Sequence, residues 1–109
     1  MKKGDIYVVN LFVGIGHEQH GYRPAILFSK LSSGMAIVIP LTTNIEALSF
    51  AHSFLVVPTR QNRLAQESVA LIFQMKSVDR NRFGKKIGHV DKVMLQKMNK
   101  IMKEFLEID

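Results

Sequence analysis

The sequence contains no cysteine among its 109 residues. Without thiols, the chain has no disulfide framework, no thiolate-bound zinc and no cysteine nucleophile. It also has no apolar stretch close to the roughly 18–20 residues that a transmembrane helix requires. Lys2, Lys3 and Asp5 bring charge into the N-terminal segment before a signal-peptide-like apolar core could form. We therefore expect a cytoplasmic protein with no contact to a membrane.

Several motifs of well-known enzyme classes are also missing. The chain has no GxxxxGK[ST] or GxGxxG loop for phosphates and no GxSxG turn for a serine nucleophile. Its four histidines, at positions 17, 20, 52 and 89, follow no metal-ligand spacing, and its carboxylates are few and scattered. We expect neither a metal ion nor another cofactor.

Length and charge limit the possibilities further. A chain of 109 residues with 47% hydrophobic content is large enough for one domain, residues 1–109, with its own core. The net charge is +6, and residues 76–103 alone carry nine Lys or Arg against two Asp. This concentration of positive charge predicts an anionic partner, either nucleic acid or an acidic protein segment. A basic face that is merely solvated is the alternative.

Most of the chain has the pattern of β-strands, with helical periodicity only at the end. Apolar, β-branched runs predict strands at 5–11, 23–29, 35–41, 54–57, 68–75 and 86–89, with helical turns near 45–48 and 79–82. Pro40 predicts a sheet edge or bulge near the end of the third strand. After a predicted N-cap at Asp91, apolar residues recur every three or four positions: Met94, Met98, Ile101, Met102 and Phe105. The pattern favours a small, strongly curved β-barrel or sandwich closed by a C-terminal helix.

Residues 14–24 form the most unusual stretch of the chain. Three glycines, two histidines, Glu18 and Arg23 lie between two apolar runs. Hairpin connections are normally about 2–5 residues long, and longer polar loops often carry function. Pro24 favours an extended backbone at Arg23, so the guanidinium is expected to project from the start of a strand. A surface loop with a solvated arginine is equally compatible with the pattern.

Arg23 and Thr42 could act together if the second and third strands are neighbours. Both side chains would then reach one side of the barrel, with His17 and Glu18 above them. An arginine for phosphate charge, a hydroxyl donor and a titratable group suit metal-free phosphodiester chemistry.

A series of motifs resembles one toxin family. The specific block is Gly16-His17-Glu18-Gln19-x-Gly21-x-Arg23-Pro24. Supporting matches are Gly4-Asp5-Ile6-Tyr7, Ile39-Pro40-Leu41-Thr42-Thr43, Ser68-Val69, Gln74 and Val78-Asp79. In this order, over nearly the whole chain, they resemble the MazF/PemK/Kid toxins of type II toxin–antitoxin systems.

The resemblance implies a mainly β fold, an SH3-like barrel of the CcdB/PemK type with about five to seven strands and a C-terminal helix. It also implies a homodimer that cleaves single-stranded RNA without metal and is blocked by an antitoxin with an acidic, disordered tail. Arg23 matches the family's catalytic arginine and Thr42 its threonine, with Thr43 as the alternative, and His17 matches a histidine of the Kid site. The acid–base pair of Kid is absent, because Leu71 and Phe73 stand at those positions.

We therefore expect transesterification by the ribose 2′-hydroxyl, which leaves a 2′,3′-cyclic phosphate and a 5′-hydroxyl. Arg23 and Thr42 would stabilise the phosphoryl oxygens, and His17 is preferred to Glu18 for proton transfer. Glu18 could equally be a loop carboxylate paired with Arg23. The candidate RNA contacts are Glu18, Gln19, Thr43, Arg60, Arg63, Lys85 and Lys86. Two non-enzymatic alternatives remain: a CcdB-like toxin that binds a topoisomerase, and an SH3-like module that only binds RNA or protein.

Overall fold

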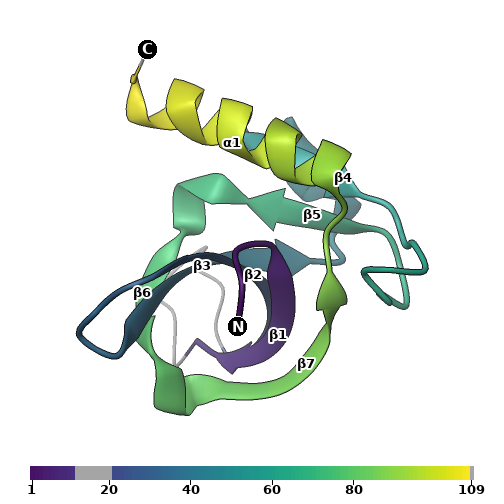
Figure 1. The fold of residues 1–109 in the computed structure, drawn as a ribbon. Coiled ribbons are helices and arrows are strands. Elements are labelled where there is room, and N and C mark those ends of the chain that lie inside the picture. The colour runs from purple at the N-terminus through teal and green to yellow at the C-terminus, as the bar shows by residue number, and fades with distance from the viewer. Residues whose placement is uncertain (12–20, 109) are drawn as a thin grey trace.

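The structure is a computed structural model, and it describes residues 1–11 and 21–108. The predicted site residues His17, Glu18 and Gln19 lie outside this range. A strongly curled antiparallel sheet occupies one side of the molecule, and a single α-helix crosses the other side over β4 and β5 (Figure 1). The elements are β1 (Asp5–Asn10), β2 (Tyr22–Lys30), β3 (Met35–Thr42), η1 (Ile45–Ser49), β4 (Ser53–Val56), β5 (Ser68–Leu71), η2 (Ile72–Gln74), β6 (Lys76–Asp79), η3 (Arg80–Arg82), β7 (Phe83–His89) and α1 (Lys92–Leu106).

The sheet confirms the mainly β prediction but is not a closed barrel. Its seven strands follow the order β4-β5-β3-β2-β1-β7, and β6 pairs with β3 beside this path. Within the described part of the chain, no ladder joins β7 to β4, so both remain sheet edges. The long central strands β1, β2 and β3 hold the sheet together, and their ends carry the candidate site.

The predicted strand at 68–75 is wrong in its second half, because the chain leaves the sheet after Leu71. β5 pairs with the end of β3, with Ala70 opposite Leu41. Continuing that register would place Phe73 opposite Val38, yet Val38 pairs with Lys76 in β6. The three residues of η2 are therefore looped out between β5 and β6, which both pair with the same edge of β3. Ile72 from this turn is fully buried in the main core, which explains why an apolar sequence interrupts the ladder.

Pro40 lies where β3 changes partners. On one side β3 pairs with β2, including Pro40 with Ala25. On the other side, β6 pairs with β3 up to Val38, and the pairing of β3 with β5 begins at Leu41. The proline, which has no N–H to donate, thus occupies a gap between two partners. The expected irregularity is present, but inside the sheet, not at its edge.

The C-terminal helix confirms the predicted periodicity. The carboxylate of Asp91 accepts a hydrogen bond from the Met94 amide at 2.8 Å and caps α1. Met98 and Met102 are buried against the sheet core, and the other residues of the predicted stripe pack around them. The helix ends at Leu106 and is followed by Glu107, whose φ of 57° places this capping residue in the left-handed region.

The segment 57–67 is fastened to the outer edge of β7. Asn62 is buried; its Oδ1 accepts from the amides of Thr59 and Leu64, and its Nδ2 donates to Val57 O. The His89 amide donates to Gln61 O at 3.0 Å. A Cβ at Gly88 would lie 2.4 Å from that same oxygen, so only glycine allows this close approach. The fastening fixes a segment that carries two of the predicted RNA contacts. At its other end β7 begins at Phe83, three residues before the predicted start, because it pairs with β1 as far as Val9 opposite Phe83.

Candidate nucleic-acid interface

The sheet register puts Arg23 and Thr42 on one face. The β2–β3 ladder ends with Ala25 opposite Pro40, and Arg23 and Thr42 come two residues further along each strand. Paired residues of antiparallel strands share a face, and side-chain direction repeats every second residue. Arg23 and Thr42 therefore extend the row begun by Ala25 and Pro40. Arg23 is exposed and Thr42 is half-buried at the end of this row.

The backbone at Arg23 is held from the other side by β1. Arg23 pairs with Val9 and Tyr22 pairs with Asn10, and the Leu11 amide donates to Gly21 O at 2.8 Å. Gly21 has a φ of 73°, a conformation that disfavours other residues. The start of β2 is thus fixed by backbone hydrogen bonds up to the point where the described chain resumes.

The hydroxyl of Thr42 has a defined partner. Its oxygen accepts a hydrogen bond from the Asn44 amide at 3.2 Å, and Asn44 in turn caps η1 by accepting from the Glu46 amide. Because the Thr42 oxygen accepts in this turn, its proton remains available as a donor to another group. Thr43 follows the strand in an exposed bend and has no such position in the ladder.

Three of the four predicted basic contacts lie together. Arg63, Lys85 and Lys86 line a hollow of about 230 Å³ on the outer side of β7. Lys86 also pairs with the buried Asp5, with Nζ 3.4 Å from Oδ2, so part of its role is structural. Arg60 is exposed on the neighbouring loop and does not line this hollow. The grouping forms a local concentration of positive charge.

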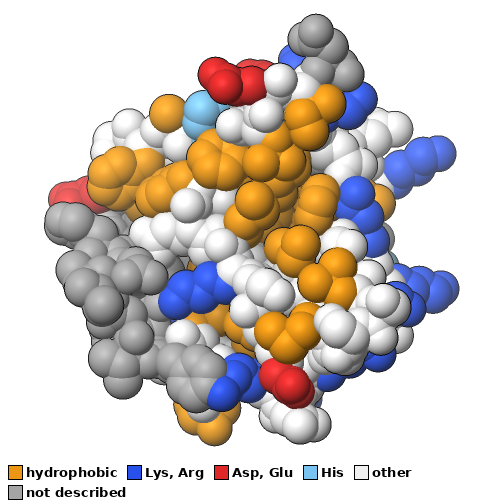
Figure 2. All heavy atoms as spheres, turned by 90° about the vertical axis from the view of Figure 1, so that its left-hand side faces the viewer, with side chains coloured by type: hydrophobic (Ala, Val, Ile, Leu, Met, Phe, Trp, Pro, Cys, Tyr) orange, Lys and Arg blue, Asp and Glu red, His pale blue; other side chains and the backbone are white. Residues whose placement is uncertain are grey.

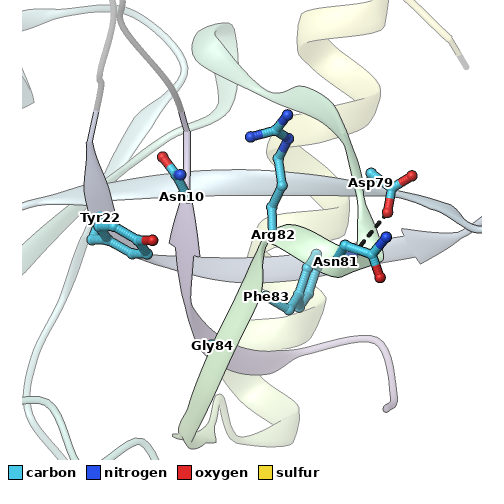
Figure 3. A pocket seen from close by; sticks show the side chains of 7 residues that line it. All are labelled: Asn10, Tyr22, Asp79, Asn81, Arg82, Phe83 and Gly84. Carbon is cyan, nitrogen blue, oxygen red and sulfur yellow. Dashed lines mark hydrogen bonds between the residues drawn. The ribbon is translucent and has the colours of Figure 1, made fainter.

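A larger pocket of about 490 Å³ opens next to the start of β2 (Figure 3). Sequence analysis did not identify its residues as functional, although Tyr22 is part of the Arg23 motif. Asn10 and Tyr22 come from the paired ends of β1 and β2, whereas the other side chains come from about 60 residues later in the chain. The principal lining residues are Asn10, Tyr22, Asp79, Asn81, Arg82 and Phe83.

The remaining titratable candidates have structural surroundings. The ring of His52 packs edge-on against Phe105 at 5.4 Å, and His89 pairs with Asp5 in the β1–β7 ladder. Asp79 caps η3 by accepting from the Asn81 backbone amide at 2.8 Å, and η3 confirms the helical turn predicted near 79–82. Residues 1–11 and 21–108 bring together no three metal-ligating side chains. No helix in that part of the chain has the length and apolarity needed to cross a membrane.

One face of the molecule is notably apolar. Figure 2 shows a broad band of hydrophobic side chains across the face that lies on the left in Figure 1. In addition, η1 exposes Ile45 and Leu48, and Phe50, which follows η1 directly, exposes 50% of its surface. Phe50 packs edge-on against the half-buried Phe73 of η2. Apolar surface of this extent commonly marks a protein–protein contact.

Solved structures with the same architecture include MazF from Deinococcus radiodurans, with a TM-score of 0.79 and 21% identity over 99% of this chain and 97% of that one. An endoribonuclease from a mycobacterial species, solved in complex with its cognate antitoxin, gives a TM-score of 0.76 at 15% identity, covering 98% and 95% of the two chains. At these identities the likeness concerns the fold.

Sequence relatives are similar over almost their full length. "Endoribonuclease EndoA" from Bacillus subtilis (strain 168) is 27% identical over 106 residues, which cover 94% of this chain and 90% of the relative. "Endoribonuclease MazF" from Staphylococcus saprophyticus is 25% identical over 103 residues, covering 91% and 85%.

The curled sheet with its crossing C-terminal helix places the molecule in the MazF structural class. A sequence profile described as "PemK-like, MazF-like toxin of type II toxin-antitoxin system" matches residues 2–106. The chain belongs to this family, so the resemblance inferred from its motifs is confirmed.

Proposed function

We propose that the protein is the toxin of a type II toxin–antitoxin pair and acts as a sequence-specific, metal-independent endoribonuclease on single-stranded RNA in the cytoplasm. The observation that supports this most directly is the shared face of Arg23 and Thr42 at the ends of adjacent strands. The relatives named as endoribonucleases support the same activity.

The chemistry follows from these two side chains. The ribose 2′-hydroxyl attacks the adjacent phosphorus, the bond to the 5′-oxygen of the next nucleotide breaks, and the products are a 2′,3′-cyclic phosphate and a 5′-hydroxyl. Arg23 donates two parallel hydrogen bonds to the phosphoryl oxygens as negative charge builds on them. Thr42 donates a hydrogen bond from its hydroxyl to the same oxygens, since its own oxygen accepts from the Asn44 amide.

Proton transfer is assigned to His17, which lies outside the described residues. An unperturbed imidazole has a pKa of about 6.5 and can exchange protons near neutral pH, whereas an arginine stays protonated. Glu18 and Gln19, in the same segment, are assigned to loop structure or base contact. Thr43, Arg60, Arg63, Lys85 and Lys86 are assigned to binding.

The partners follow from charge and surface. The basic hollow of Arg63, Lys85 and Lys86 supports contact with RNA phosphates or with an acidic antitoxin tail. The apolar surface around Phe50 supports a symmetric homodimer, because burying it in a second copy removes it from water. The solved complex of a mycobacterial endoribonuclease with its cognate antitoxin supports an antitoxin partner here.

The direct test is single-turnover cleavage of a single-stranded RNA pool in the presence of EDTA, with products mapped by sequencing and end-group analysis. We expect cuts at a short recurring sequence, 2′,3′-cyclic phosphate ends, and no cleavage where a 2′-deoxy nucleotide precedes the scissile phosphate. Binding without cleavage would instead support a non-catalytic module or a CcdB-like toxin. Loss of activity in EDTA that returns with a divalent cation would contradict the metal-free mechanism.

A further inference from the structure

The pocket beside the start of β2 has the features of a base-binding site. We propose that it holds one unstacked base of the RNA and reads part of the recognised sequence, an inference that rests on the proposed function. Its volume of about 490 Å³ lies within the usual range for small-ligand sites, roughly 300–1,000 Å³. Figure 3 shows Tyr22 and Asn10 on one side and the residues of the 79–83 segment on the other.

Tyr22 provides the stacking surface. It lines the pocket and is 71% exposed, the highest exposure among the large hydrophobic side chains of the central strands. Its backbone is nevertheless fixed, because Tyr22 pairs with Asn10 at the end of the β1–β2 ladder. A solvent-exposed ring on a rigid strand is poorly explained by folding, but it suits stacking with a base of single-stranded RNA.

The polar side chains of the pocket, with Asn10 beside Tyr22 and the others across from it, can read a base edge. Asn10 and Asn81 each carry an amide with both donors and an acceptor, and Arg82 carries only donors. Asp79 adds a carboxylate. This carboxylate accepts a hydrogen bond from the backbone amide of Asn81, which fixes the turn from which Asn81 and Arg82 project. Bases differ in the order of donors and acceptors along their edges, so a pocket with both kinds of group distinguishes between them.

The pocket also lies at the right place relative to the reaction. Tyr22 directly precedes Arg23, so their Cα atoms are about 3.8 Å apart and their side chains leave β2 on opposite faces. In a nucleotide, the base and the phosphate extend to opposite sides of the ribose. A nucleotide that crosses the end of β2 therefore places its base against Tyr22 and its phosphate near Arg23. The recognised base is then next to the scissile bond.

The proposed stacking is tested by combining abasic RNA analogues, which lack one base, with variants that lack the ring of Tyr22. After the cut site has been mapped, a 2′-deoxy oligonucleotide with that sequence is made with a single abasic position at each place in turn. Binding of each oligonucleotide is measured for the wild type, Tyr22→Ala and Tyr22→Phe. Loss of one base–aromatic stack should weaken wild-type binding about tenfold at one position adjacent to the scissile phosphate. The same abasic change should cost Tyr22→Ala less than twofold, while Tyr22→Phe should behave like the wild type.

Two further variants separate base reading from general effects. Asn81→Ala should change which base is preferred at that position in the mapped cut sites and leave the other positions unchanged. Val93→Ala, an equally exposed apolar truncation on α1, should change neither profile. Equal abasic penalties in wild type and Tyr22→Ala at every position, with an unchanged profile in Asn81→Ala, would overturn the base pocket while leaving the nuclease intact. Absence of any RNA binding by the wild type would remove the proposed function and the pocket with it.

Discussion

At the scale of single residues, the proposed function assigns to Arg23 the stabilisation of charge on the phosphoryl oxygens. Its position at the open end of the β2–β3 row suits contact with a phosphate that gains charge during the reaction. Arg23→Ala should therefore slow single-turnover cleavage by a factor on the order of 10²–10³, as loss of one donor to developing charge typically does. Binding to a 2′-deoxy analogue should change far less, because other cations still contact the backbone.

Arg23→Lys is the matched control for charge alone. A lysine keeps the positive charge but cannot copy the planar, two-pronged contact, so it should restore little of the rate. Full activity in Arg23→Ala, or full rescue by lysine, would contradict the assigned role.

Thr42 gives a second residue-level prediction. Thr42→Val keeps the shape of the side chain but removes the hydroxyl, and with it the donor and the bond from the Asn44 amide. We expect a smaller rate loss than for Arg23→Ala, with little change in binding, because the lost group is neutral. Thr43→Val is the comparison, since Thr43 lies outside the ladder and is assigned to binding, so its loss should affect affinity more than rate. A larger rate loss in Thr43→Val than in Thr42→Val would reassign the hydroxyl to Thr43.

At the scale of elements, the attachment of segment 57–67 to β7 can be tested by a substitution that adds a single methyl group at the contact. Gly88→Ala would place a Cβ against the Gln61 carbonyl oxygen, so the loop must shift. We expect a loss of about 2 kcal/mol in the free energy of unfolding and weaker RNA binding, because Arg63 moves with the loop. Urea unfolding followed by circular dichroism measures the first effect.

Gly84→Ala is the control, because it makes the same substitution at another glycine of β7. Its nearest non-neighbouring atom would be Val8 O at 3.3 Å, a milder contact, so the cost in unfolding free energy should be clearly smaller. Equal stability of the two variants would show that the loop yields without cost.

The helices and strands differ in how far the sequence predicts them, depending on whether their signals are local. The helix was predictable because Asp91 and the spaced methionines are local signals that packing reinforces. The break after Leu71 was not, because Ile72 and Phe73 are good strand residues and only the shift of β3 partners explains the turn. Placing Arg23 and Thr42 on one face required knowing that β2 and β3 are neighbours. The pocket required knowing that β1 and η3 meet, which spacing along the chain cannot show.

At the scale of the whole molecule, the exposed apolar surface leads to a prediction about assembly. We expect a dimer at micromolar concentration by light scattering, because the surface around Phe50 is then buried. Phe50→Lys should shift the population toward the monomer by placing a charge in the contact. Val93→Lys, an equal change on an exposed helix position, should leave the dimer unchanged. A monomeric wild type would contradict the assembly.

Charge provides the last whole-molecule prediction. An acidic antitoxin tail and RNA should compete for the basic hollow, and both affinities should fall as salt concentration rises. The measurement is displacement of a labelled 2′-deoxy oligonucleotide by a tail peptide at several salt concentrations. A ternary complex in which neither ligand weakens the other would place the two at separate sites.

The backbone contacts between the end of β1 and the start of β2 have an evolutionary consequence. The Asn10–Tyr22 pair and the bond from the Leu11 amide to Gly21 O fasten both ends through the backbone, independently of the side chains in between. Because these bonds are made by backbone groups at the two ends, substitutions between the ends leave the pairing of β1 with β2 in place. A lineage of such proteins can therefore change residues 12–20 other than His17 while Arg23 keeps its position. Substrate preference can then diverge while the phosphate contact proposed for Arg23 is retained, and grafting this segment between relatives with His17 kept is a direct way to observe it.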